Sequence, residues 1–379
     1  MVYKINPFHT SVWHFPDTLQ IGLDAHKIVI PRLSAAAEKF IDALYFGVAP
    51  NQVAALAGQA RLPQTEAVQL LQRLRPVLEI AAPIHSQQPN PGQPINLDAA
   101  FADLVAASLK TATDGRAVLQ ERGRRAVFID DLDATGLMLM LGLAAAGVGT
   151  FVTRDNTTVR SADTGPASFP PAFHGQKRIA AATLMLQATW PSSQLVSALR
   201  LKDTKLNNID VAILTNELVA EPLPIGTWNA RQVPQLEIRF EAGGFSVSPV
   251  IIPGVTPCLV CRELWAIANQ PEYVAVNSQL AGTEIRFDHT SNRLLAAGFA
   301  MQNILVQLDS AAGFGARPSG GAGVAGSAGV TGGAGVTGGY VVRDAGPSGG
   351  GPCVSVAELG WDYHPDCSCA LLIAPAAIV

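Results

Sequence analysis

The chain has 379 residues, of which 48% are hydrophobic and 15% are charged, so it can bury a sizeable core and exceeds the usual length of one domain. Its formal net charge of -4 supplies no excess of Lys and Arg for a phosphate backbone or an anionic lipid surface, so neither nucleic acid nor a membrane is expected as a partner. Residues 1–16 lack the pattern of a signal peptide, and no apolar run reaches roughly 18 residues, which predicts a cytoplasmic protein.

Residues 1–82 are expected to form a small winged-helix-like α+β module. Residues 19–32 contain two short apolar stretches on either side of a polar turn at 24–27, which predicts a β-hairpin. Apolar residues then recur at helical spacing between residues 34 and 78, as expected for three helices. Residues 83–94 hold four prolines among Gln, Asn and Ser, and this composition predicts a linker.

Residues 95–310 are predicted to form a Rossmann-like α/β domain with a mostly parallel sheet and flanking helices. Apolar runs mark the expected strands and the first buried helix at residues 126–129, 136–146, 149–153, 211–215 and 236–240. Strands that alternate with helical segments favour a parallel sheet. Asp155, just after the second strand, is where a nucleotide-binding fold carries an acid.

Residues 311–352 are rich in Gly and Ala and are predicted to be a flexible loop. Three six-residue repeats at 322–339 lack large apolar side chains and cannot build a core, although an added strand or repeat turn is the alternative. Folded character resumes at Tyr340–Val342. Residues 353–379 are therefore expected to return to the core as a C-terminal segment.

Four of the five cysteines form two pairs in the sequence, Cys258 with Cys261 and Cys367 with Cys369. Four thiolates fill the tetrahedral coordination of Zn²⁺, which predicts a closed structural zinc site, with reduced buried thiols as the alternative. A gap of one residue can still place two sulfurs on one metal, and His364 is a spare ligand if Cys369 cannot reach. The site would complete the C-terminal part of the fold.

These landmarks resemble the ThiF-type adenylating fold of the ubiquitin-activating-enzyme superfamily. Gly136, the Ala-Gly-Val-Gly run at 146–149 and Asp155 have the family's separations. The family's Pro-Gly-x-x-Pro-Cys-x-x-Cys signature stands at residues 253–261, and its late cysteine pair stands at 364–369. The resemblance implies a site for ATP and Mg²⁺ with Asp155 on the ribose, although Asp155 can equally be a turn or capping acid.

The residues that would hold the nucleotide phosphates depart from the family pattern. The first two glycines of the phosphate loop fall on Asp131 and Asp133, whose carboxylates would repel phosphate oxygens. The family's Ser-Asn-Leu-x-Arg-Gln motif keeps only its serine at 161–166, with Gly165 in place of arginine. The magnesium aspartate falls on Asn216, whose amide is a poor ligand for Mg²⁺. ATP and Mg²⁺ are therefore not expected to bind.

The resemblance, together with the loss of the residues that would hold phosphate and Mg²⁺, suggests a non-catalytic protein that binds a peptide or protein client and presents it to a modifying enzyme. No catalytic residue is assigned. Residues 19–80 resemble the leader-peptide clamp of relatives in azole-forming peptide modification, in which the peptide adds a strand to an open sheet edge. The alternatives are an active adenylyltransferase for a peptide C-terminus, with Lys177 or Arg178 as its cation, and a structural subunit. The thioester cysteine that some activating enzymes use is one interpretation of Cys353. A small buried residue in a strand is the favoured one. A homodimer is expected in each case.

Overall fold

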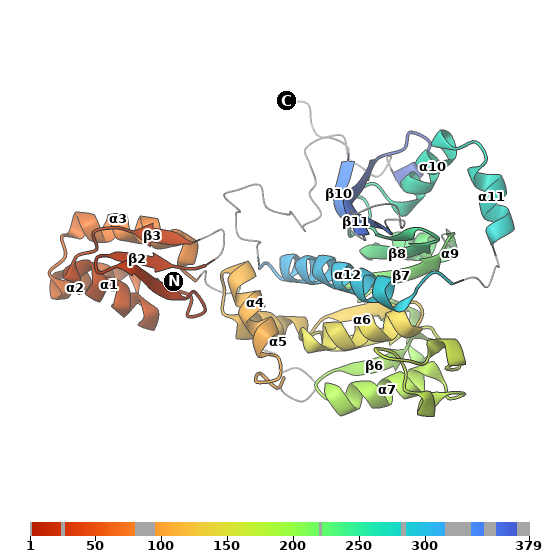
Figure 1. Ribbon diagram of the computed structural model, residues 1–379, viewed down its shortest axis with the longest axis horizontal. Coiled ribbons are helices and arrows are strands. Elements are labelled where there is room, and N and C mark those ends of the chain that lie inside the picture. The colour runs from red at the N-terminus through yellow and green to blue at the C-terminus, as the bar shows by residue number, and fades with distance from the viewer. Residues whose placement is uncertain are drawn as a thin grey trace. The chain divides into compact units, whose positions relative to one another are not determined.

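The computed structural model describes residues 2–23, 27–79, 95–219, 222–281, 286–314, 335–344 and 354–369 (Figure 1). The chain divides into two compact units. The first unit comprises Met1–Pro89, Asn96–Glu121 and Asp309–Val324, and the second comprises Asn90–Ile95, Arg122–Leu308 and Ala325–Val379. The predicted linker at 83–94 lies outside the described residues. The first unit also takes in α4 (Phe101–Thr111) and α5 (Gly115–Arg122), except for the last residue of α5.

The described residues 2–79 of the first unit form a three-stranded antiparallel sheet in the order β1-β2-β3, accompanied by α1, α2 and α3. Its elements are β1 (Ser11–Phe15), β2 (Thr18–Ile21), β3 (Ile28–Ile30), α1 (Ala35–Phe46), α2 (Val53–Ala60) and α3 (Gln64–Leu74). The predicted hairpin is present as β2 and β3, which pair Leu19 with Ile30. The N-terminus of α1 is capped by the Ser34 side chain, which accepts from the Ala37 N–H at 3.1 Å.

The second unit contains an eight-stranded sheet in the order β11-β10-β9-β8-β7-β4-β5-β6, and the predicted mostly parallel α/β fold is confirmed. The parallel strands are β4 (Ala126–Ile129), β5 (Thr150–Thr153), β6 (Gln194–Ser197), β7 (Val211–Glu217) and β8 (Gln235–Glu241). Antiparallel pairing adds β9 (Gly244–Val247), β10 (Gly335–Asp344) and β11 (Val354–Asp362).

Helices cover both faces of this sheet, because its strands bury alternate residues on opposite sides. Ile129 of β4 packs with α6 (Ala134–Ala145), α7 (Arg178–Thr189) and α12 (Thr290–Ala311). Phe128, its neighbour in β4, packs on the other face with α9 (Pro222–Ala230) and α10 (Leu259–Asn269). The unit is thus a three-layer α/β structure, completed by α8 (Asp203–Leu206) and α11 (Tyr273–Leu280).

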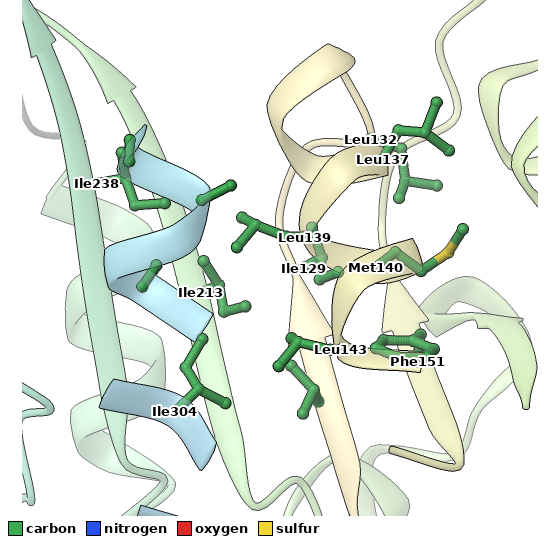
Figure 2. Packing of buried hydrophobic residues seen from close by; sticks show 14 of the residues in the cluster. Ile129, Leu132, Leu137, Leu139, Met140, Leu143, Phe151, Ile213, Ile238 and Ile304 are labelled. Atoms are coloured by element: carbon green, nitrogen blue, oxygen red, sulfur yellow. The ribbon is translucent and has the colours of Figure 1, made fainter. Parts of the chain in front are cut away.

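Figure 2 shows the first of these faces, where Leu139 and Leu143 of α6 lie over the sheet together with Ile304 of α12. The three side chains are at most 1% exposed. Full burial of one such side chain stabilises the folded state by about 1.5–3 kcal/mol. This packing fixes the start of α6, where the candidate site lies, against the carboxyl ends of the parallel strands.

The predicted loop over 311–352 is corrected by β10, which begins at Gly335 inside the last repeat. Position 339 of this strand requires glycine, because a Cβ there would lie 2.6 Å from the carbonyl oxygen of Val247. Residues 315–334 and 345–353, with Cys353, lie outside the described residues. Among the helices that are described, none is long and apolar enough to cross a membrane.

Candidate functional site

The predicted nucleotide residues gather at the carboxyl ends of β4, β5 and β7. Asp131 and Asp133 follow β4, Asp155 follows β5, and Asn216 lies near the end of β7. In the sheet, β5 and β6 lie on one side of β4, and β7 and β8 lie on the other. The strand order therefore reverses at β4, and α/β sheets bind ligands at such a topological switch point. The four residues predicted from the family positions therefore lie in one region of the fold.

The N-terminus of α6 is occupied by the chain's own carboxylate. Asp133 Oδ1 accepts from the backbone N–H groups of Thr135 at 2.9 Å and Gly136 at 3.0 Å. In a phosphate-binding loop such N–H groups would face the anion. Gly136 is required by packing, because a Cβ there would lie 1.9 Å from the Asp131 carbonyl oxygen.

Arg178, the first residue of α7, is enclosed by three carboxylates. Its Nη1 lies 2.5 Å from Asp131 Oδ1 and 3.2 Å from Asp155 Oδ2, and its Nη2 lies 2.7 Å from Asp163 Oδ2. The Arg178 side chain is 3% exposed, and those of Asp155 and Asp163 are 2% and 0% exposed. The guanidinium charge is therefore compensated inside the protein.

A second arginine, Arg286, reaches the same place from the segment before α12. Its Nη2 lies 2.7 Å from Asp133 Oδ2 and 2.6 Å from Asp288 Oδ2, and its Nη1 lies 3.3 Å from Asp163 Oδ1. Arg286 and Asp288 belong to no motif, and Asp163 lies in the 161–166 segment, where only the serine matches the family pattern, so none of the three was predicted as a site residue. We call these residues, with Asp131, Asp133, Asp155 and Arg178, the carboxylate–arginine network.

Asp155 behaves in the structure as a turn acid. Its Oδ1 accepts from the Thr157 N–H at 2.7 Å and hydroxyl at 2.6 Å, and its Oδ2 accepts from the Leu132 N–H at 2.9 Å. Burial opposes ionisation, but these hydrogen bonds outweigh it and hold the pKa of Asp155 below its usual value. Desolvation and the nearby Asp133 carboxylate instead raise the pKa of Asp131, whose side chain is half exposed.

The two remaining candidates are engaged elsewhere. Lys177 precedes α7, and its Nζ donates to the carbonyl oxygen of Asn156 at 2.5 Å. Asn216 Nδ2 donates to Glu237 Oε1 at 2.7 Å, and Glu237, fully buried on β8, also contacts Arg239 and Arg262. The amide nitrogen of Asn216 therefore belongs to a buried cluster with Glu237, Arg239 and Arg262.

Glu217 gives the region a pH dependence. Burial, and secondarily the Asp288 carboxylate, raise the pKa of Glu217 from 4.5 to about 7. Between these values the folded chain keeps a proton that the unfolded chain releases, so the free energy of unfolding falls as the pH rises through this window. We expect Glu217→Gln to remove about 1–2 kcal/mol of that fall. Urea unfolding at several pH values measures how the free energy of unfolding changes with pH. Glu272→Gln, at an exposed position, is the control. If the free energy of unfolding depends on pH equally in the two variants, the assignment to Glu217 is wrong.

The four paired cysteines converge in the second unit. Their Sγ atoms all lie within 4.8 Å of one another, with Cys258 3.5 Å from Cys367 and Cys261 3.2 Å from Cys369. Four sulfurs about 2.3 Å from one Zn²⁺ would be about 3.8 Å apart, so the donor set fits a tetrahedral ion. The gap of one residue between Cys367 and Cys369 does not prevent the convergence. The group can hold a metal ion.

His364 is not needed as the fourth ligand. Its Nδ1 accepts from the Asp366 N–H at 3.2 Å, and its ring packs edge-on against Trp265 at 4.7 Å between centroids. Its carbonyl oxygen accepts from the Cys367 N–H at 3.0 Å. His364 therefore shapes the turn that presents Cys367.

The chain shares its fold with E. coli MccB, a ThiF-like adenylating enzyme, as the resemblance of its motifs predicted. Its structural neighbours include E. coli MccB bound to MccA, with 13% identity, a TM-score of 0.65 and coverage of 97% of this chain and 99% of that one. MccB crystallised with ATP matches with 12% identity, a TM-score of 0.63 and the same coverage. PaaA matches with 12% identity and a TM-score of 0.50 over 68% of this chain and 85% of that one. No family model and no curated protein sequence matches the chain.

Proposed function

We propose that this chain is a non-catalytic ThiF-fold protein that binds a peptide or protein client and serves a modifying enzyme. One observation carries the proposal: Asp133 occupies the N-terminus of α6, where a nucleotide phosphate would bind in an active relative. The likeness to MccB, whose solved complexes include MccA, supports a peptide as the client.

The charge of the carboxylate–arginine network supports the loss of nucleotide binding. Five aspartates surround the guanidinium groups of Arg178 and Arg286, and Arg160 and Arg293 pair with Asp163 and Asp288 of the same set, so each of these arginines is already engaged by the protein's own carboxylates. A carboxylate whose charge is not fully compensated opposes a phosphate charge about 4 Å away by about 1–4 kcal/mol. A neutral Asn216 bonded to Glu237 supplies no carboxylate for a bridging Mg²⁺.

A structural zinc ion completes the proposal. The four cysteines would hold it from α10 and from the segment after β11, and thereby tie the C-terminal residues to the sheet. With every position filled by sulfur, the ion would leave no open coordination site for chemistry. Its role is to stabilise the fold.

The test is isothermal titration of the purified chain with ATP and Mg²⁺, alongside ATP–pyrophosphate exchange with peptides that have free C-termini. We expect a Kd weaker than about 1 mM, since the electrostatic terms remove several kcal/mol of binding. MccB, solved with ATP, is the positive control. Asp131→Gly/Asp133→Gly/Asn216→Asp should restore weak ATP binding. Exchange activity in the unaltered chain would replace this proposal with an adenylyltransferase.

A further inference from the structure

A small cavity opens onto the four paired cysteines of the second unit. Its volume is about 140 Å³, and Cys258, Cys367, Ser368 and Cys369 are among the residues that line it. Cys369 is partly exposed, whereas the other three cysteines of the group are buried. A water molecule occupies about 30 Å³ in the liquid, so the cavity can admit a molecule as small as hydrogen peroxide. The sulfurs can therefore be reached by a small oxidant.

The shortest distances between sulfurs join α10 to the segment after β11. Cys261 Sγ lies 3.2 Å from Cys369 Sγ, and Cys258 Sγ lies 3.5 Å from Cys367 Sγ. Cys258 and Cys261, which are close in sequence, have sulfurs 3.9 Å apart. A disulfide needs its sulfurs at about 2.05 Å, so the two pairs between the segments require the least movement. Oxidation would thus join residues that are 108 and 109 positions apart in the chain.

The two segments are also held together by contacts that involve no sulfur. Trp361 Nε1 donates to the carbonyl oxygen of Cys258 at 3.0 Å. The Tyr363 hydroxyl donates to the carbonyl oxygen of Val255 at 2.8 Å. Because neither bond depends on a metal ion, they keep the thiolates of the two segments close to one another when the ion leaves.

We propose that a peroxide converts this cysteine group into two disulfides, Cys258–Cys367 and Cys261–Cys369, and thereby releases the metal ion. The inference rests on the zinc ion of the proposed function. In each pair one thiolate attacks the peroxide, breaks its O–O bond and becomes a sulfenic acid, while the hydroxide that leaves takes a proton and forms water. The second thiolate then attacks the sulfenic sulfur, and the displaced hydroxide is protonated to a second water. The sulfurs are oxidised, the peroxide oxygens are reduced, and loss of all four thiolates frees Zn²⁺.

The two disulfides take over the structural role of the zinc ion. Each of them closes a loop of more than 100 residues and so restricts the unfolded chain. The segment after β11 therefore stays joined to α10 after the metal is lost. A chain that has lost its zinc to a chelator under reducing conditions has no such bond, so the two zinc-free forms should differ in stability.

The test treats the zinc-loaded full chain with hydrogen peroxide and follows zinc release with a colorimetric indicator. About one zinc ion per chain should be released, and dithiothreitol with added zinc should restore it. Peptide mapping by mass spectrometry without reduction should identify the two disulfides. The oxidised chain should melt about 10 °C above the chelated, reduced chain.

Cys353→Ser is the matched control, because it removes the fifth cysteine and leaves the group of four intact. It should release zinc and form both disulfides at the rate of the unaltered chain. Cumene hydroperoxide, which is too bulky for the cavity, should release zinc more slowly than hydrogen peroxide.

Four results would overturn the inference: zinc retained in peroxide, a Cys258–Cys261 disulfide, sulfinic acids in place of disulfides, or equal rates with the two peroxides. A chain that contains no zinc before the peroxide is added would instead contradict the zinc assignment, and the disulfide map would still decide the pairing. The ATP titration is independent of all these outcomes, so the proposed loss of nucleotide binding is judged separately.

Discussion

Cys258→Ser is expected to lower zinc content from about one ion per chain to near zero and to destabilise the second unit by roughly 5 kcal/mol. The metal binds the folded state far better than the unfolded one, so its binding free energy becomes folding free energy. Cys258 is 3% exposed and lies 3.9 Å from Cys261, so loss of its thiolate leaves three sulfurs without their tetrahedral partner. Metal analysis with thermal unfolding measures both effects.

Chelation of the unaltered chain should reproduce the shift in melting temperature, and added zinc should reverse it. Cys258→Ser itself should then show little further loss on chelation. If the chain is purified without any chelator and still contains no metal, the assignment of a metal site to the four cysteines is wrong. If Cys258→Ser keeps its full zinc content but has a lower melting temperature, the Cys258 thiol stabilises the fold by packing and not as a metal ligand.

Arg178→Met is expected to destabilise the second unit by about 3–5 kcal/mol, because it leaves buried carboxylates without a compensating positive charge. The Asp163 and Asp155 side chains are 0% and 2% exposed, and each is within 3.2 Å of the Arg178 guanidinium. Methionine fills a similar volume, so the loss reflects charge more than packing. Urea unfolding of the second unit gives the free energy.

Arg154→Gln is the matched control, since Arg154 pairs with Asp130 but is 48% exposed. Loss of an exposed pair should change stability by less than about 1 kcal/mol. Asp163→Asn added to Arg178→Met should recover part of the loss. Similar unfolding of Arg178→Met and the unaltered chain would mean that the network does not hold α7 in place.

Local pattern in the sequence predicted the parts of the fold whose signals lie close together. The β2–β3 hairpin, the buried apolar strands and the two cysteine pairs each occupy short segments with residue types suited to their roles. The first half of β10 was predicted only as the alternative to a loop, because Gly335–Gly339 carries no large side chain; its pairing with β9 and β11 forms the strand instead. β1 was missed because four of its five residues are exposed and show no alternation.

The candidate site was predictable only in part for the same reason. Asp131, Asp133 and Asp155 stand at family positions, so their meeting at the strand ends followed from the register. Arg286 lies 153 residues from Asp133 in the chain and belongs to no motif. The pairing of Arg178 with Asp163 depends on how α7 packs, which no local pattern encodes. The sequence therefore predicted repulsion at this site and offered Arg178 as a candidate cation, but it did not predict that Arg178 and Arg286 pair with these carboxylates.

The cap that Asp133 places on α6 also acts as a tethered competitor. A carboxylate joined to the helix by the backbone has an effective concentration at that N-terminus of millimolar or more, whereas a free anion must arrive from solution. Any anion that approaches the Thr135 and Gly136 N–H groups must first displace it and break its contact with Arg286. This competition does not depend on the base or the sugar. On the proposed function, it would oppose the binding of pyrophosphate and inorganic phosphate as well as that of ATP.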